Sequence, residues 1–101
     1  MKLLTKEILK KLPALYSQEK VEDPMVQVKF FNPTGAGTWY GIEYDGEDTF
    51  FGLCSIQEAE LGYFSLTELQ AYRGRFGLGI ERDRHFRPQP LSKVKEVENY
   101  R

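Results

Sequence analysis

Two runs rich in aromatic and β-branched residues, Thr38–Tyr44 and Thr49–Ser55, flank the turn sequence Asp45-Gly46-Glu47-Asp48. An Asp-Gly pair between two such runs is a strong hairpin signal, because glycine readily adopts the backbone angles of a tight turn. A two-residue loop and a four-residue loop leave the same residues on each face. The sequence therefore predicts two paired antiparallel strands in the middle of the chain.

Strand alternation assigns each side chain of this hairpin to one of two faces. The predicted core face carries Thr38, Tyr40, Ile42, Tyr44, Thr49, Phe51 and Leu53, and the other carries Trp39, Gly41, Glu43, Phe50, Gly52 and Cys54. The two glycines on the second face are either covered by neighbouring aromatic rings or form the floor of a groove. We favour covering, and we expect Trp39 to be partly accessible beside them.

Capping and periodicity place the remaining elements. Thr5, Ser65 and Ser92 are candidate N-caps for helices over Lys6–Leu12, Leu66–Arg73 and Lys93–Tyr100, and in the second helix we expect Leu66, Leu69 and Tyr72 to be buried. Two further runs, Met25–Phe31 and Leu78–His85, predict strands. The sum is an α+β fold, a single domain over residues 1–101 with a mostly antiparallel sheet of about four strands and two or three short helices. The tail, about 92–101, is short enough to fray.

Composition fits a globular domain, with 41% hydrophobic and 29% charged residues in 101. The single cysteine, Cys54, cannot form an internal disulfide, and its expected role is that of a buried apolar side chain. The apolar run near Met1 is too short for a signal peptide, and no stretch approaches a membrane span. We therefore expect a cytoplasmic protein that does not bind a membrane.

Charge is unevenly distributed along the chain. The segment from Phe30 to Tyr72 has seven carboxylates and no lysine or arginine, whereas five arginines follow between residues 73 and 87. Such segregation indicates either a partner surface or internal pairing and solvation, and we favour the latter for most of these charges. Two other interpretations assign chemistry to these residues.

The first is a metal or catalytic site. If residues 80–86 are extended, Glu81, Asp83 and His85 share one face, as the ligands of a small metal-dependent hydrolase would. Alternating charges on a half-exposed strand are more often ion pairs, so we predict no metal, no cofactor and no catalytic residue here. The loop Gly35-Ala36-Gly37 lacks the lysine and the following helix of a phosphate loop.

The second is a surface for single-stranded nucleic acid. Phe76 and Phe86 are interleaved with five arginines, namely Arg73, Arg75, Arg82, Arg84 and Arg87, and this combination suits phosphates and stacked bases. The isoelectric point of about 5.8 argues against it, since nucleic-acid modules are usually basic. It remains an alternative to a protein partner.

Several fragments, in their order and spacing, resemble one bacterial family: Leu3-Leu4-Thr5-Lys6-Glu7, Val28-Lys29-Phe30-Phe31-Asn32-Pro33, Thr38-Trp39-Tyr40, Asp45-Gly46-Glu47-Asp48, Phe50-Phe51-Gly52, Glu60-Leu61-Gly62-Tyr63-Phe64-Ser65-Leu66 and Ile80-Glu81-Arg82-Asp83. From about Leu3 to Leu91 the chain is similar to the family called domain of unknown function 2958. The resemblance implies small accessory proteins of plasmids and conjugative elements, often near antirestriction genes. It implies no catalytic residues.

We therefore predict an interaction or regulatory module of a mobile genetic element, with an unidentified protein as partner and a counter-defence role as one version. The residues predicted to bind the partner are Trp39, Glu43, Phe50, Glu60, Tyr63, Glu81, Arg82 and Asp83. Trp, Tyr and Arg most often dominate binding energy in interfaces, which is why the set is built around them. The sequence does not predict the oligomeric state.

Overall fold

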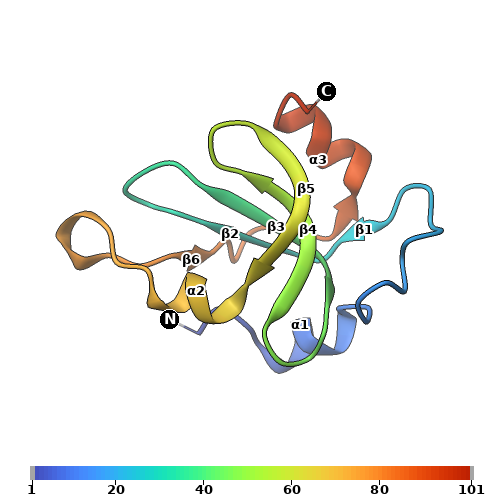
Figure 1. The fold of residues 1–101 in the computed structure, drawn as a ribbon, viewed down its shortest axis with the longest axis horizontal. Coiled ribbons are helices and arrows are strands. Elements are labelled where there is room, and N and C mark those ends of the chain that lie inside the picture. The colour runs from blue at the N-terminus through green and yellow to red at the C-terminus, as the bar shows by residue number, and fades with distance from the viewer. Residues whose placement is uncertain (1, 101) are drawn as a thin grey trace.

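The computed structural model describes residues 2–100, which form one α+β domain around a five-stranded antiparallel sheet (Figure 1). In spatial order the strands are β5 (Ala59–Ser65), β4 (Thr49–Ser55), β3 (Thr38–Tyr44), β2 (Val28–Phe31) and β6 (Glu81–Arg82). A second, two-stranded sheet pairs β1 (Met25–Val26) with β7 (Gln89–Pro90). The helices are α1 (Lys6–Lys11), α2 (Leu66–Ala71) and α3 (Leu91–Val97), with a 3₁₀ turn, η1 (Arg75–Gly77).

The large sheet has a core on each face. On one face, Val28, Phe30, Tyr44 and Phe50 are buried beneath α1 and α2, with Leu69 from α2. On the other face α3 covers the sheet, and the buried residues are Val26, Tyr40, Ile42, Leu53, Leu91 and Val94. Figure 1 shows α1 and α3 at opposite ends of the view with the sheet between them. Because α3 is short, it covers only part of its face.

The predicted fold class is confirmed, and so are two of the predicted helix starts. The Thr5 hydroxyl accepts a hydrogen bond from the Ile8 N–H at 3.2 Å, and the Ser65 hydroxyl accepts one from the Glu68 N–H at 3.2 Å. The second helix ends earlier than predicted, at Ala71, so Tyr72 is 44% exposed. The third begins at Leu91 because the Asp23 carboxylate accepts hydrogen bonds from both the N–H and the hydroxyl of Ser92.

A β-bulge changes the faces that strict alternation assigned. The hairpin loop spans the four predicted residues, but the β3–β4 register shifts between Gly41 and Glu43, so Glu43 pairs with Phe51 and Tyr44 pairs with Phe50. Tyr44 therefore stacks on Phe50, with ring centroids 4.4 Å apart, and Glu43 moves to the face of Phe51. The predicted faces of Glu43 and Tyr44 are wrong for this reason. Those of Tyr40, Phe50 and Leu53 agree with the register.

Gly41 is covered by neighbouring side chains and does not form the floor of a groove. A methyl group there would lie 2.8 Å from Val28 Cγ1 and 3.2 Å from the Phe50 ring, so these side chains fill the space above it. Trp39 lies on this same face, partly buried, as predicted. Around Gly41 this face is packed and leaves no open floor.

The other strands differ from the prediction in three places. The strand β5 was not predicted, which raises the main sheet from about four strands to five. The run Met25–Phe31 divides at Gln27 into β1 and β2, which belong to different sheets. The strand predicted over Leu78–His85 is limited to Glu81–Arg82, because the chain turns at Asp83, whose carboxylate accepts the His85 N–H at 2.9 Å.

Candidate binding groove

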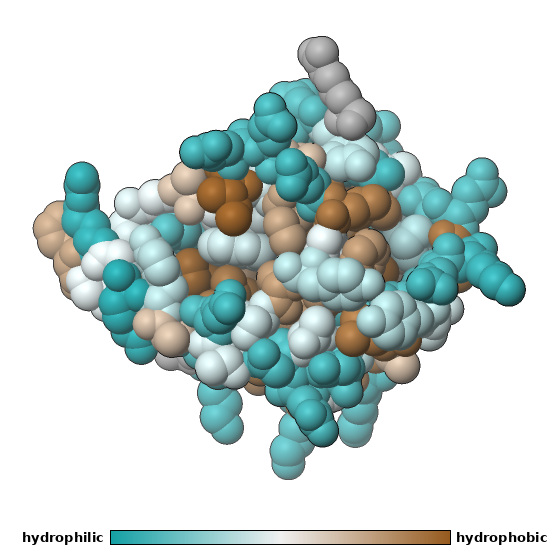
Figure 2. All heavy atoms as spheres, viewed as in Figure 1, coloured by the Kyte–Doolittle hydropathy of each residue, from teal (hydrophilic) through white to brown (hydrophobic). Residues whose placement is uncertain are grey.

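An open groove of about 510 Å³ lies on the face that α3 only partly covers. We call it the β5 groove. Its walls are the connection after α1, the strands β3 to β5 and the helix α3, and its lining residues are Tyr16, Gln18, Glu19, Val21, Glu22, Pro24, Ile42, Glu43, Phe51, Leu61, Tyr63, Leu91 and Lys95. In the space-filling view, apolar residues gather in the centre of this side of the molecule and hydrophilic ones surround them (Figure 2).

Two exposed tyrosines form one end of the groove. Tyr16 is 59% exposed and Tyr63 56% exposed, and their rings meet edge to face with centroids 6.4 Å apart. Tyr63 also packs against Phe51, with centroids 5.1 Å apart, so its ring is held from two sides. Desolvation, followed by the hydrogen bond with Tyr16, raises the pKa of the Tyr63 phenol. Rigid aromatic rings that stay exposed are suited to bind a partner at little entropic cost.

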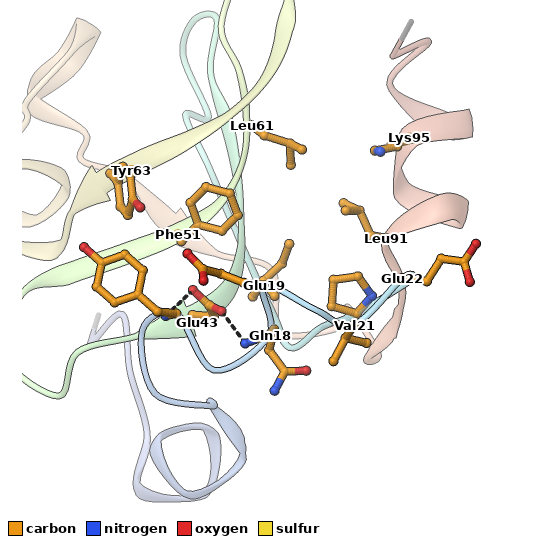
Figure 3. Close-up of a pocket in the computed structure, with 13 residues that line it drawn as sticks. Gln18, Glu19, Val21, Glu22, Glu43, Phe51, Leu61, Tyr63, Leu91 and Lys95 are labelled. Atoms are coloured by element: carbon orange, nitrogen blue, oxygen red, sulfur yellow. Dashed lines mark hydrogen bonds between the residues drawn. The ribbon is translucent and has the colours of Figure 1, made fainter.

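The carboxylate of Glu43 fixes the connection that carries Tyr16. Glu43 is only 3% exposed, and its two oxygens accept hydrogen bonds from the Tyr16 N–H at 2.9 Å and the Gln18 N–H at 2.7 Å (Figure 3). Tyr16 has a φ of 69°, which is unusual for a residue other than glycine. The bulge in β3 is what turns Glu43 toward this connection. Glu43 thus positions one wall of the groove.

Acidic groups predominate in the groove. Glu19 and Glu22 join Glu43 in its lining, whereas Lys95 is the only lysine or arginine there. Glu19 directs its carboxylate toward Glu43 and Phe51 (Figure 3). Within residues 2–100 the one ion pair is Lys29–Asp83, so in this part of the chain none of these carboxylates is paired with a lysine or arginine. The groove therefore favours a ligand that combines apolar groups with positive charge.

The predicted partner-binding residues are divided by the fold. Glu43 and Tyr63 come together in the β5 groove. Phe50 is fully buried, stacked between Tyr44 and Phe64, and its side chain has no access to a partner. Trp39 and the exposed Glu60 lie on the opposite face of the sheet, because both pair with Cys54 across the ladder.

The remaining predicted residues lie at the far edge of the sheet. Glu81 and Arg82 form β6, four strands from β5, and the Arg82 guanidinium donates to the Lys2 carbonyl at 2.6 Å. The Asp83 carboxylate pairs with the Lys29 ammonium at 3.6 Å. Within the described part of the chain no three His, Cys, Asp or Glu side chains group as metal ligands, and His85 is exposed beyond the end of β6.

In residues 2–100 none of the five arginines pairs with the acidic segment, so the pairing part of the internal pairing and solvation that we favoured is wrong for them. Arg73, Arg75, Arg84 and Arg87 are exposed, and Arg73 donates to the backbone carbonyls of Gln70 and Tyr72. Solvation accounts for them instead, since exposed ion pairs contribute little stability. Phe76, 85% exposed at the tip of η1, lies between Arg75 and Gly77 with a φ of 61°.

Cys54 lies outside the groove, and we expect its thiol to be unreactive. Desolvation, with a smaller effect from the nearby Glu60 carboxylate, raises the pKa of its thiol to about 11. Since the thiolate is the reactive form, we expect Cys54 to react with an alkylating reagent at pH 8 far more slowly than a cysteine in an unfolded peptide, whose pKa is about 8.5. The rate of thiol modification, measured with and without denaturant, checks this. Equal rates in both would contradict it.

Most of the groove-lining residues were not predicted from the sequence. Tyr16, Leu61, Leu91 and Lys95 were not among the predicted site residues, and Phe51 was assigned to the core. Alternation of Ala59, Leu61 and Tyr63 on one side of a strand was a signal for the β5 wall. No local signal predicts that the connection after α1 and the helix α3 complete the groove.

The fold and the groove define a small α+β domain with an open, acidic and partly aromatic groove on one face. The chain belongs to the family described as Protein of unknown function (DUF2958), whose profile matches residues 3–99. This confirms the family resemblance seen in the sequence. Neither curated proteins nor solved structures gave a match. None of the helices in residues 2–100 has the length and apolar character needed to cross a bilayer.

Proposed function

We propose that this chain is a cytoplasmic protein-interaction module that binds a basic, partly apolar segment of a partner protein in the β5 groove. We propose that it acts in a mobile genetic element, as the family resemblance implies. Interference with a host defence is one role that we propose for it there. The observation that carries the proposal is the exposed, rigid tyrosine pair above unpaired carboxylates. Exposed apolar surface of this kind marks interaction sites in soluble proteins.

The chemistry of the groove supports a peptide segment as the ligand. Phe51 and Leu61 offer apolar contacts, and the two tyrosines add rings with polar ends. Glu19 and Glu22 are exposed, so a lysine or arginine of the partner can reach them without being fully desolvated. An acidic or purely apolar segment would leave these carboxylates without a partner.

The experiment is capture of partners from a lysate with and without nuclease, followed by affinity measurement with the partner that is found. We expect nuclease-resistant capture, and we expect Tyr63→Ala to weaken binding about tenfold or more, as truncation of an interface hot spot does. Tyr72→Ala is the matched control, because Tyr72 is 44% exposed and lies outside the groove. Equal losses for both variants, or none for Tyr63→Ala, would contradict the assignment of the groove.

Single-stranded nucleic acid is the second candidate, and Phe76 is the observation that favours it. A ring 85% exposed beside Arg73 and Arg75 is placed to stack on a base while the arginines contact phosphates. Capture that is lost on nuclease treatment, and oligonucleotide binding that falls steeply with salt and with Phe76→Ala, would put this function first.

A further inference from the structure

We propose that the free edge of β5 pairs with β5 of a second copy of this chain, so that two sheets join into one across a two-fold axis. The strand β5 ends the five-stranded sheet and is seven residues long, whereas the opposite edge strand, β6, has two. A strand of this length offers about 24 Å of unpaired edge. Proteins usually protect such an edge with charged side chains, proline or a bulge, and β5 has no proline, lysine or bulge and a single charged residue, Glu60.

The hydrogen-bonding groups on this edge can be assigned from the ladder with β4. The Leu66 N–H donates to the Asp48 carbonyl at 2.8 Å, next to the Ser65–Thr49 pair. Because backbone groups alternate along an antiparallel strand, those of Phe64, Gly62 and Glu60 also point toward β4. The N–H and C=O groups of Ala59, Leu61 and Tyr63 then point outward, and no backbone bond from these three residues to an element other than β4 occurs in residues 2–100. Ser65 is the N-cap of α2, so its carbonyl accepts the first bond of that helix and only its N–H is left for the edge.

This edge is complementary to itself. An antiparallel pairing of two copies centred on Gly62 matches the outward groups of Leu61 with those of Tyr63. At each end it also places the Ser65 N–H opposite the Ala59 carbonyl. Leu61 and Tyr63 are 38% and 56% exposed on the groove face, so their contact would bury apolar surface from both copies. Both β5 grooves would lie on the same side of the joined sheet.

Charge and space also permit this pairing. Each Glu60 would face Phe64 of the other copy, so the two Glu60 carboxylates would not oppose each other, and the net charge of the chain is only −1. A side chain at Gly62 would meet nothing within 4 Å inside the chain, so no intrachain contact accounts for glycine there. On the two-fold axis the two Gly62 residues would pair without side chains on the face opposite the groove.

The test is the oligomeric state and a register-specific cross-link, neither of which needs the groove's partner. In sedimentation equilibrium over a series reaching millimolar protein, we expect a dimer that Leu61→Lys weakens about tenfold or more, because the lysine would face Tyr63 of the other copy. Ile56→Lys is the control, since Ile56 is 55% exposed and lies outside β5. If the chain is monomeric at every concentration of the series, the proposal is wrong. This holds whether the β5 edge stays unpaired or pairs with a strand of another protein.

For the cross-link, the native cysteine is removed by Cys54→Ser and a new one is introduced by Gly62→Cys. In the proposed register the two Cα atoms at position 62 lie about 4.5 Å apart, within disulfide range, so we expect a covalent dimer on mild oxidation. Glu60→Cys is the control, because its two copies would be about 14 Å apart and would not cross-link. Equal cross-linking at both positions, or none at Gly62→Cys, overturns this interface.

Discussion

Replacing Gly52 by alanine should destabilise the domain by about 3 kcal/mol or more, at the upper end of the range for overpacked sites. A methyl group on Gly52 would lie 1.7 Å from the backbone carbonyl oxygen of Tyr40. That oxygen belongs to β3 just before the bulge, so relief requires the backbone of two central strands to move. A flexible side chain could relieve the contact by changing its rotamer. A carbonyl group in a sheet ladder can move only at a large cost in free energy.

The matched control is Gly62→Ala. Gly62 is the cross-strand partner of Gly52, and a methyl group there meets nothing within 4 Å. We expect this variant to change stability by less than about 0.5 kcal/mol, as surface substitutions usually do. Chemical denaturation of both variants at low protein concentration makes the comparison. Equal stabilities would show that the backbone at Gly52 relaxes freely, and the account of the bulge would then be wrong.

The sequence predicted elements with local chemical causes. The hairpin loop forms because the Asp45 carboxylate accepts the N–H groups of Asp48, Glu47 and Thr49, interactions that also lower the pKa of Asp45. The caps at Thr5 and Ser65 depend on one hydroxyl and a donor three residues away. Such contacts are contained in a few consecutive residues, so a sequence pattern is enough to predict them.

The strand β5 was missed because its composition argues against a strand. Gly62 and Glu60 have low strand propensity, and their presence hides the alternation of Leu61 and Tyr63. Pairing with β4 along seven residues overrides that weak preference. The bulge was missed for a related reason, since a register shift at Gly41 and Glu43 depends on the partner strand and leaves no mark in one strand alone.

The candidate site was predictable only in part, because the groove is made by tertiary structure. Glu43 and Tyr63 were selected for their chemistry and do meet in the groove, but Phe50 was selected on the same grounds and is fully buried. Aromatic residues build cores and interfaces equally well, so residue type alone does not separate them. Phe50 is buried because its face of the sheet lies beneath α1 and α2. Tyr63 is exposed because it lies on the other face, which the short helix α3 covers only in part.

Replacing Glu43 by glutamine should cost about 2 to 4 kcal/mol of stability and weaken partner binding at the same time. The amide keeps the shape of the carboxylate but turns an NH₂ group toward one of two backbone donors, so one hydrogen bond to a charged acceptor is lost and the other is weakened. Tyr16 would lose the contact that holds its unusual backbone conformation. The Tyr16–Tyr63 end of the groove would then open.

Amide hydrogen exchange gives this prediction a residue-level readout. The N–H groups of Tyr16 and Gln18 should exchange slowly in the native chain and much faster in Glu43→Gln, while amides of β4 change little. Glu19→Gln is the matched control for hydrogen exchange, because Glu19 lines the same groove but is exposed, and in residues 2–100 its side chain accepts no backbone N–H. Loss of its charge is itself expected to weaken the binding of a cationic partner. If Glu19→Gln reduced partner binding while Glu43→Gln did not, the groove would act through its exposed charge alone, and the positioning role of Glu43 would be refuted.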